Sequence, residues 1–205
     1  MLFCDVPFNM LISGMTDCGK TYYVLDLLEQ DFLKTFDYIV IFCPSIEMNK
    51  TYQHRKWVGN DPYIYVYPPD KTKMDLNSAL EDAMNMFRDS DAQTLFLIDD
   101  CANLWESKNK CTKLTELGFS GRHYGISVWL ITQKYNAVCK DFRENCKHMI
   151  IHTMNDQASF DQIFRENRCL PLHEKNNIIE ELDADKKLLL RRTPPLQYNI
   201  EEKNV

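Results

Sequence analysis

The sequence has few glycines and prolines and no long apolar run. Its 205 residues include 6 glycines and 8 prolines, which argues against a long linker or disordered segment. Every apolar run is shorter than the roughly 20 residues of a membrane-spanning helix, and residues 1–10 lack the basic start of a signal peptide. We therefore expect a single domain over residues 1–205, in an intracellular protein without a membrane span.

Basic residues are not in excess, and no two cysteines form a C-x-x-C pair. The formal net charge of −6 disfavours a monomer that coats nucleic acid, although a ring with a few basic loops facing inward is compatible with it. The 8 cysteines are spread singly, and Cys139, Cys146 and His148 match no common zinc module. Disulfide frameworks are typical of short secreted chains, so free cysteines in a reducing compartment are the better interpretation.

Apolar runs alternate with amphipathic segments along most of the chain. Short runs that are apolar on both faces predict strands at 8–13, 38–43, 94–98, 126–132 and 149–153, with a further candidate at 63–67. Apolar residues at helical spacing predict helices at 20–33, 75–87 and 112–117. Two glycines indicate a break at 118–121. The alternation predicts an α/β fold with a mostly parallel central sheet and helices on both of its faces.

The C-terminal quarter of the chain continues this pattern less regularly. It predicts helices around 160–165 and 175–182 and a strand at 188–191. The tail at 199–205 is polar and is expected to fray. We expect a core over about 8–153 and a helical and strand extension over about 154–205.

The clearest motif follows the first predicted strand. Residues 14–21 match the P-loop pattern G-x-x-x-x-G-K-[ST] in full, between an apolar strand and an amphipathic helix. In such a loop the glycines let backbone N–H groups face phosphate oxygens, and the next helix adds its positive dipole end. Lys20 is expected to reach the β- and γ-phosphates, and the Thr21 hydroxyl to bind Mg²⁺. The sequence thus predicts an ATP site made by Gly14, Met15, Thr16, Asp17, Cys18, Gly19, Lys20 and Thr21.

An acidic pair ends the predicted strand at 94–98. This is the Walker B arrangement, in which a strand beside the P-loop strand presents carboxylates at its C-terminal end. Asp99 is expected to bind Mg²⁺, and Asp100 occupies the place where many such ATPases carry a glutamate that polarises the attacking water. Outside the context of a P-loop, two adjacent aspartates would indicate only a surface turn.

Two further polar residues flank the predicted strand at 126–132. Gln133 follows it, where an amide can contact the γ-phosphate or orient water, or can simply cap the strand in solvent. Arg122 precedes it, where a guanidinium can stabilise the transition state in a neighbouring subunit, or can pair with a surface acid. Position alone leaves both pairs of alternatives open.

Three segments together resemble a known family. They are G-x-x-x-x-G-K-T, then L-F-L-I-D-D, then R-H-Y-G-I-S-V-W-L-I-T-Q at 122–133. Their order and spacing resemble the poxvirus-type genome-packaging ATPases, which belong with the bacterial FtsK and archaeal HerA-type motors. The resemblance covers about residues 8–153. It departs in one respect, because Asp100 stands where the bacterial translocases carry glutamate, so the resemblance alone does not identify the water-activating carboxylate.

The resemblance implies a homo-oligomeric ring, commonly of five or six subunits, with a RecA or FtsK–HerA-like fold. Such a ring hydrolyses ATP to move double-stranded DNA into a preformed capsid through a portal or vertex, at the viral assembly site in the host cell. Arg122 matches the family's arginine finger that acts on a neighbouring subunit, and Gln133 matches its polar sensor. Arg143 is a second candidate finger.

Contacts with DNA are poorly indicated by the sequence, and other functions compete. Small groups of lysines are candidates, although solvated loops are the favoured explanation for them: Lys71, Lys73, Lys108, Lys110 and Lys113. A small-molecule or nucleoside kinase shares the P-loop and the size, but the sequence lacks a compact arginine-rich lid. A scaffold that binds nucleotide without hydrolysis is disfavoured by the intact Lys20 and acidic pair.

Overall fold

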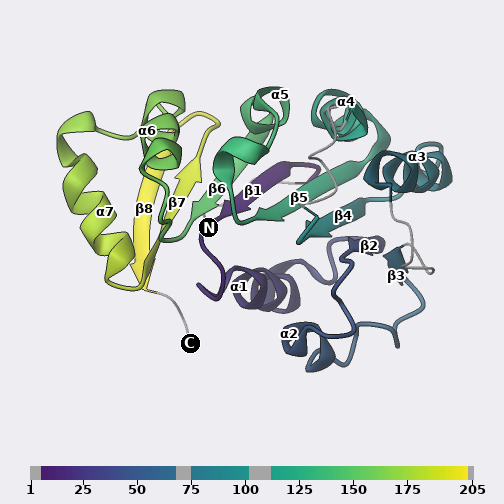
Figure 1. The fold of residues 1–205 in the computed structure, drawn as a ribbon. Helices are drawn as coiled ribbons and strands as arrows, with labels where there is room; N and C mark the ends of the chain where they lie inside the picture. The colour runs from purple at the N-terminus through teal and green to yellow at the C-terminus, as the bar shows by residue number, and fades with distance from the viewer. Residues whose placement is uncertain (1–5, 68–74, 102–111, 203–205) are drawn as a thin grey trace.

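The computed structural model describes residues 6–67, 75–101 and 112–202 (Figure 1). Its centre is an eight-stranded sheet in the order β3-β2-β4-β5-β1-β6-β7-β8. The first six strands in that order run parallel, and the β6–β7 and β7–β8 pairs are antiparallel. The strands are β1 (Asn9–Ser13), β2 (Tyr38–Phe42), β3 (Ile64–Tyr67), β4 (Thr94–Asp99), β5 (Ile126–Thr132), β6 (Cys146–Ile151), β7 (Lys186–Arg191) and β8 (Gln197–Glu202).

Helices cover both faces of this sheet, as Figure 1 shows. One face carries α1 (Lys20–Leu27), the π-helical turn η1 (Leu28–Phe32) and α2 (Lys50–Gln53). The other carries α3 (Leu76–Phe87), α4 (Thr112–Ser120), α5 (Lys140–Glu144), α6 (Gln157–Glu166) and α7 (Lys175–Asp183). The mostly parallel sheet with helices on both faces is therefore confirmed. None of the helices in the described ranges is long and apolar enough to cross a membrane.

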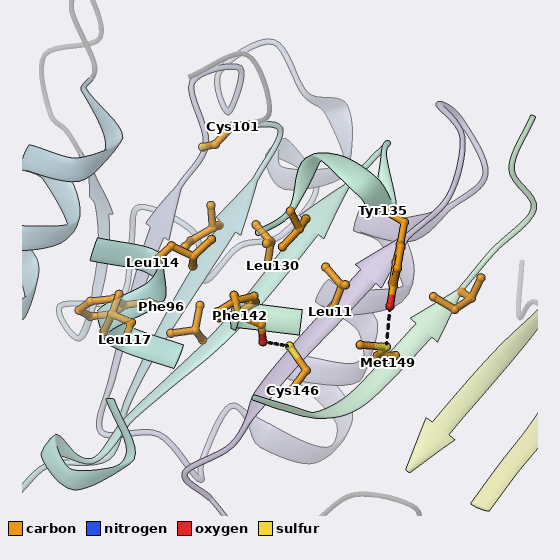
Figure 2. Close-up of a cluster of buried hydrophobic side chains, with 14 of the residues drawn as sticks. Leu11, Phe96, Cys101, Leu114, Leu117, Leu130, Tyr135, Phe142, Cys146 and Met149 are labelled. Carbon is orange, nitrogen blue, oxygen red and sulfur yellow. Dashed lines mark hydrogen bonds between the residues drawn. The ribbon is translucent and has the colours of Figure 1, made fainter. Parts of the chain in front are cut away.

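Strand side chains alternate between two hydrophobic cores, one on each face of the sheet. Leu11 packs in the core beneath α3 to α7, whereas Met10 and Ile12 pack beneath α1. Figure 2 shows part of the first core, where Phe142 lies among side chains from the strands. Trp129 is completely buried in the second core. Because the central strands are buried on both faces, their sequences are continuous apolar runs.

The expected break after residue 117 is wrong. Helix α4 continues to Ser120, and the 3-10 turn η4 (Gly121–Tyr124) follows it. Gly118 lies against the adjacent helix α5. A β-carbon at this position would be 3.3 Å from the ring of Phe142, so a larger residue would crowd that ring. The glycine therefore serves close helix packing rather than helix termination.

The expectation of a frayed tail is also wrong over most of its length. Residues 197–202 form β8, which pairs with β7 in antiparallel register from Gln197 to Glu202. Tyr198 and Ile200 pack against the core, whereas Gln197 and Asn199 are exposed. Hydrophobic residues at every second position are the signature of a strand with one covered face. The strands of the C-terminal extension therefore continue the same sheet.

The topology brings three strand ends to one place. Strands β4, β5 and β1 are adjacent and parallel, so their C-terminal ends share one edge of the sheet. The P-loop follows β1, the acidic pair ends β4, and Gln133 follows β5. Ligands of open α/β sheets bind at the carboxyl ends of such strands.

Candidate active site

The P-loop is tied to both strands that flank β1. The amide of Gly14 donates to the Thr132 carbonyl at 3.3 Å, and the amide of Met15 donates to the Thr153 carbonyl at 2.9 Å. A β-carbon at Gly14 would lie 2.6 Å from that of His152, so the loop leaves β1 where only glycine fits. Gly19 has a φ of 85°, the left-handed region that favours glycine. Each glycine of the motif thus has its own steric reason.

Lys20 places its ammonium group over the loop itself. It begins α1 and is 7% exposed. Its Nζ donates to the Met15 carbonyl at 2.5 Å and lies 3.6 Å from the Cys18 sulfur. The unpaired amide groups of the first turn of α1 lie at the same point of the chain. A buried cation and a helix N-terminus together favour an anion of the phosphate type.

Asp99 is buried at the end of β4 and accepts two hydroxyl hydrogen bonds on one oxygen. Thr21 Oγ1 donates to Oδ2 at 2.9 Å, and Tyr52 Oη donates to the same oxygen at 3.0 Å. Burial raises the pKa of the Asp99 carboxyl to about 6, although both hydroxyl hydrogen bonds act in the opposite direction. A hydroxyl beside a carboxylate is the hard oxygen donor set that suits Mg²⁺, so these residues fit the expected metal.

Asp100 turns away from the strand in an unusual backbone conformation. Its φ is 54°, in the left-handed region that costs energy for a residue other than glycine. Its Oδ1 accepts a hydrogen bond from Gln133 Nε2 at 3.3 Å, and its Oδ2 lies 3.5 Å from the Ser45 hydroxyl. Such strain is characteristic of functional positions, and here it directs an exposed carboxylate to the mouth of the pocket.

Gln133 connects the P-loop to the acidic pair. Its Oε1 accepts a hydrogen bond from Thr16 Oγ1 at 3.1 Å, while its amide nitrogen donates to Asp100. The Gln133 side chain therefore links Thr16 of the P-loop to Asp100. One pocket is lined by Thr16, Asp17, Lys20, Thr21, Asn49, Asp99, Asp100, Ile131, Thr132 and Gln133. Of the remaining loop residues, Met15 lines a neighbouring pocket with Thr16.

Arg122 does not belong to this pocket. It lies in η4 at the start of β5, and Gln133 follows the other end of the same strand. Seven strand residues span about 20 Å, so the two side chains lie at opposite ends of β5. The Arg122 side chain is exposed. Within one copy of the chain its guanidinium is remote from the pocket that Gln133 lines.

The hypothesis that Arg143 is a second finger is wrong. Arg143 is 6% exposed, and its guanidinium is held by Glu166, with contacts of 2.6 Å from Nη2 and 3.0 Å from Nε. A further hydrogen bond joins it to the Val138 carbonyl, and it lies 4.8 Å from the centre of the Tyr135 ring. A finger must reach another subunit, whereas this side chain joins α5 to α6 inside the fold.

The lysines proposed to contact DNA are mostly outside the described residues: Lys71, Lys73, Lys108 and Lys110. Lys113 lies on α4 and forms ion pairs of 3.1 Å with both Glu81 and Glu116. Its contact with DNA stays a prediction.

Sequence reasoning missed the segment that follows β2. Tyr52 contacts Asp99, and Asn49 lines the pocket. Residues 44–73 carry no motif and many polar side chains, so no periodicity or spacing marked these two positions.

The chain is similar in sequence to poxvirus proteins. The family model described as Poxvirus A32 protein matches residues 2–190. DNA packaging protein OPG160 of vaccinia virus (strain Western Reserve) is 28% identical over 148 residues, which are 70% of this chain and 52% of that protein. The monkeypox virus protein of the same name is also 28% identical over 148 residues, 70% of this chain and 47% of that protein. The chain thus spans about half the length of the curated relatives it matches.

Solved structures with the same fold extend over almost the whole chain. The genome packaging NTPase B204 of Sulfolobus turreted icosahedral virus 2, in complex with AMPPCP, aligns with a TM-score of 0.71 and 16% identity. That alignment covers 95% of this chain and 97% of B204. EssC (ATPases 2 and 3) of Geobacillus thermodenitrificans aligns with a TM-score of 0.62 and 12% identity, over 97% of this chain and 41% of that one. These similarities confirm the P-loop NTPase fold.

Proposed function

The chain belongs to the family described as Poxvirus A32 protein, and on this basis we propose that it is the ATPase of a viral DNA-packaging motor. The proposed reaction is ATP hydrolysis coupled to the translocation of double-stranded viral DNA into a preformed capsid. One observation carries the proposal: part of the P-loop, including Lys20 and Thr21, lines a single pocket with the pair Asp99–Asp100 and Gln133, at the carboxyl ends of three adjacent strands. The relatives named DNA packaging proteins support the choice of DNA as the cargo.

Each residue of the pocket has its own role in the proposed reaction. The P-loop amides and Lys20 bind the phosphates of ATP. Thr21 and Asp99 hold Mg²⁺, which when bound neutralises charge on the phosphate oxygens. Asp100 accepts a proton from the attacking water. Gln133, held between Thr16 and Asp100, orients that water relative to the γ-phosphate.

A ring of identical subunits completes the proposed site. Arg122 is remote from the pocket of its own chain, so it can act on ATP only when a second copy presents it. A contact between two different surfaces of identical subunits forms a ring when the rotation between copies closes after a whole number of subunits. We expect five or six subunits, docked on a capsid portal or vertex at the viral assembly site in the infected cell.

Steady-state ATP hydrolysis with and without linear double-stranded DNA tests this proposal. We expect hydrolysis that DNA stimulates several-fold, and its loss in Lys20→Ala. Lys140→Ala is the matched control, because Lys140 is a surface residue that pairs only with Glu144 at 3.3 Å in the described structure, and it should behave as the wild type.

Two results would contradict the proposal. Phosphoryl transfer to a nucleoside in preference to water would identify a kinase. Tight ATP binding without hydrolysis in an assembled, DNA-loaded ring would identify a nucleotide-binding scaffold.

A further inference from the structure

The short helix α2 lies beside the nucleotide pocket. It begins after Asn49, whose side chain accepts a hydrogen bond from the Thr51 amide at 3.0 Å. Asn49 itself lines the pocket. Three residues later, Tyr52 is 1% exposed and packs in the core beneath α1. The segment thus fixes a buried aromatic ring directly behind the pocket wall.

The hydroxyl group of Tyr52 is bonded to Asp99. Its donation to Oδ2 at 3.0 Å joins that of Thr21 at 2.9 Å, so one carboxylate oxygen receives both hydroxyl groups. No hydrogen bond from the described residues reaches Oδ1, the oxygen left for a cation in the pocket that Asp99 lines. When hydrogen bonds hold one oxygen of a carboxylate in place, the direction of its second oxygen is fixed as well.

We infer that Tyr52 is a positioning residue that orients the Asp99 carboxylate for Mg²⁺, an inference that rests on the proposed function. Thr21 is expected to bind the metal itself, whereas the buried Tyr52 is held in the core and retains Asp99 as its partner. Removal of the Tyr52 hydroxyl frees the carboxylate to rotate and weakens metal binding without touching the P-loop.

The chain offers a matched control for this substitution. Tyr135 is also completely buried, and its hydroxyl donates to Glu166 Oε2 at 2.6 Å. Tyr135 packs in the core on the opposite face of the sheet and does not line the nucleotide pocket. Tyr135→Phe therefore deletes the same chemical group from the same kind of bond, at a place with no expected role in metal binding.

The test is equilibrium binding of a fluorescent ADP analogue, titrated with Mg²⁺ and repeated in EDTA. We expect Tyr52→Phe to raise the half-saturating Mg²⁺ concentration about tenfold, the effect of one lost hydrogen bond to a charged group. Affinity for the metal-free analogue should be unchanged. Tyr135→Phe should retain the wild-type Mg²⁺ requirement, and melting curves establish that both variants are folded at the assay temperature.

An unchanged Mg²⁺ requirement in folded Tyr52→Phe overturns the inference, as does an equal change in Tyr135→Phe. Asn49→Ala supplies a second variant that loosens the start of α2 and keeps the phenol. We expect it to raise the Mg²⁺ requirement as well, and no rise would count against the inference. Failure of the proposed function is distinguishable, because it is measured as wild-type ATP hydrolysis and its stimulation by DNA, whereas this test compares the Mg²⁺ requirement of the variants with that of the wild type.

Discussion

At the scale of single residues, the site stores unfavourable energy in its two aspartates. Asp99 is a carboxyl group buried to 3% exposure, and that burial raises its pKa to about 6. Asp100 adopts a left-handed backbone conformation that most side chains avoid. Neither feature stabilises the folded protein. Features that destabilise the fold are expected at residues that are retained for function.

The raised pKa of Asp99 makes stability depend on pH. Because the folded-state pKa lies above the unfolded value of about 3.9, the contribution of this group is fully present below about pH 4 and is lost as pH rises through about 6. We therefore expect Asp99→Asn, without nucleotide or metal, to be more stable than the wild type at pH 8 by about 3 kcal/mol. The difference should vanish near pH 4. Urea unfolding at the two pH values in EDTA measures it.

Asp161 provides a control of opposite sign for this experiment. A hydrogen bond from Lys175 and a second from Gln157 lower the pKa of the Asp161 carboxyl. Its contribution is therefore present above the unfolded pKa and is lost at lower pH, so Asp161→Asn should reduce stability at pH 8. A wild type that is as stable as Asp99→Asn at pH 8 would show that the buried carboxylate carries no penalty.

At the scale of elements, the two arginines that the sequence offered as candidate fingers have different surroundings in the fold. Arg143 pairs with Glu166 in a largely buried contact between α5 and α6, with side chains 7% and 8% exposed. Arg122 is exposed in η4. Removal of one member of a buried ion pair leaves an uncompensated charge, whereas removal of an exposed charge has a small effect.

We expect Arg143→Ala to reduce the free energy of unfolding by about 3–5 kcal/mol and Arg122→Ala to change it by less than about 0.5 kcal/mol. Urea denaturation of the two variants and the wild type gives both values. Conversely, Arg122→Ala should lose DNA-stimulated hydrolysis while folded. If Arg143→Ala is as stable as the wild type, Arg143 is not the structural link between α5 and α6.

The elements themselves were predicted best where one periodicity dominates. The continuous apolar runs at 38–43, 94–98 and 126–132 are strands β2, β4 and β5 within a residue at each end. The expectations of a frayed tail and of a break at Gly118 were wrong because they relied on residue type alone and not on the neighbouring elements. Tyr198 and Ile200 need β7 beside them to form a strand, and Gly118 is placed by the ring of Phe142.

At the scale of the whole molecule, the nucleotide pocket and Arg122 lie at opposite edges of the sheet. A single chain therefore contains both the pocket and Arg122 of the proposed catalytic centre, but it cannot bring them into contact. Two copies in a head-to-tail contact can do so, which is the type of contact that closes a ring.

Mixed rings test this arrangement. Asp100→Asn and Arg122→Ala should each abolish hydrolysis alone, because each lacks one half of every site. Mixed in equal amounts, they should restore about a quarter of the sites, those that pair an intact Asp100 with an intact Arg122 from the neighbour. ATPase activity across mixing ratios, with crosslinking to verify co-assembly, measures the rescue. Absence of rescue in verified mixed rings would exclude Arg122 as a finger that acts on the neighbouring subunit.

The sequence by itself determined the nucleotide loop, the acidic pair and the class of fold. These depend on local rules: backbone freedom at Gly14 and Gly19, and burial of strands on both faces. Only the tertiary structure assigned Tyr52 to Asp99, 47 residues away, and buried Arg143 against Glu166. Such partners are chosen by the packing of elements whose separation along the chain carries no information about their contact, so no spacing in the sequence reveals them.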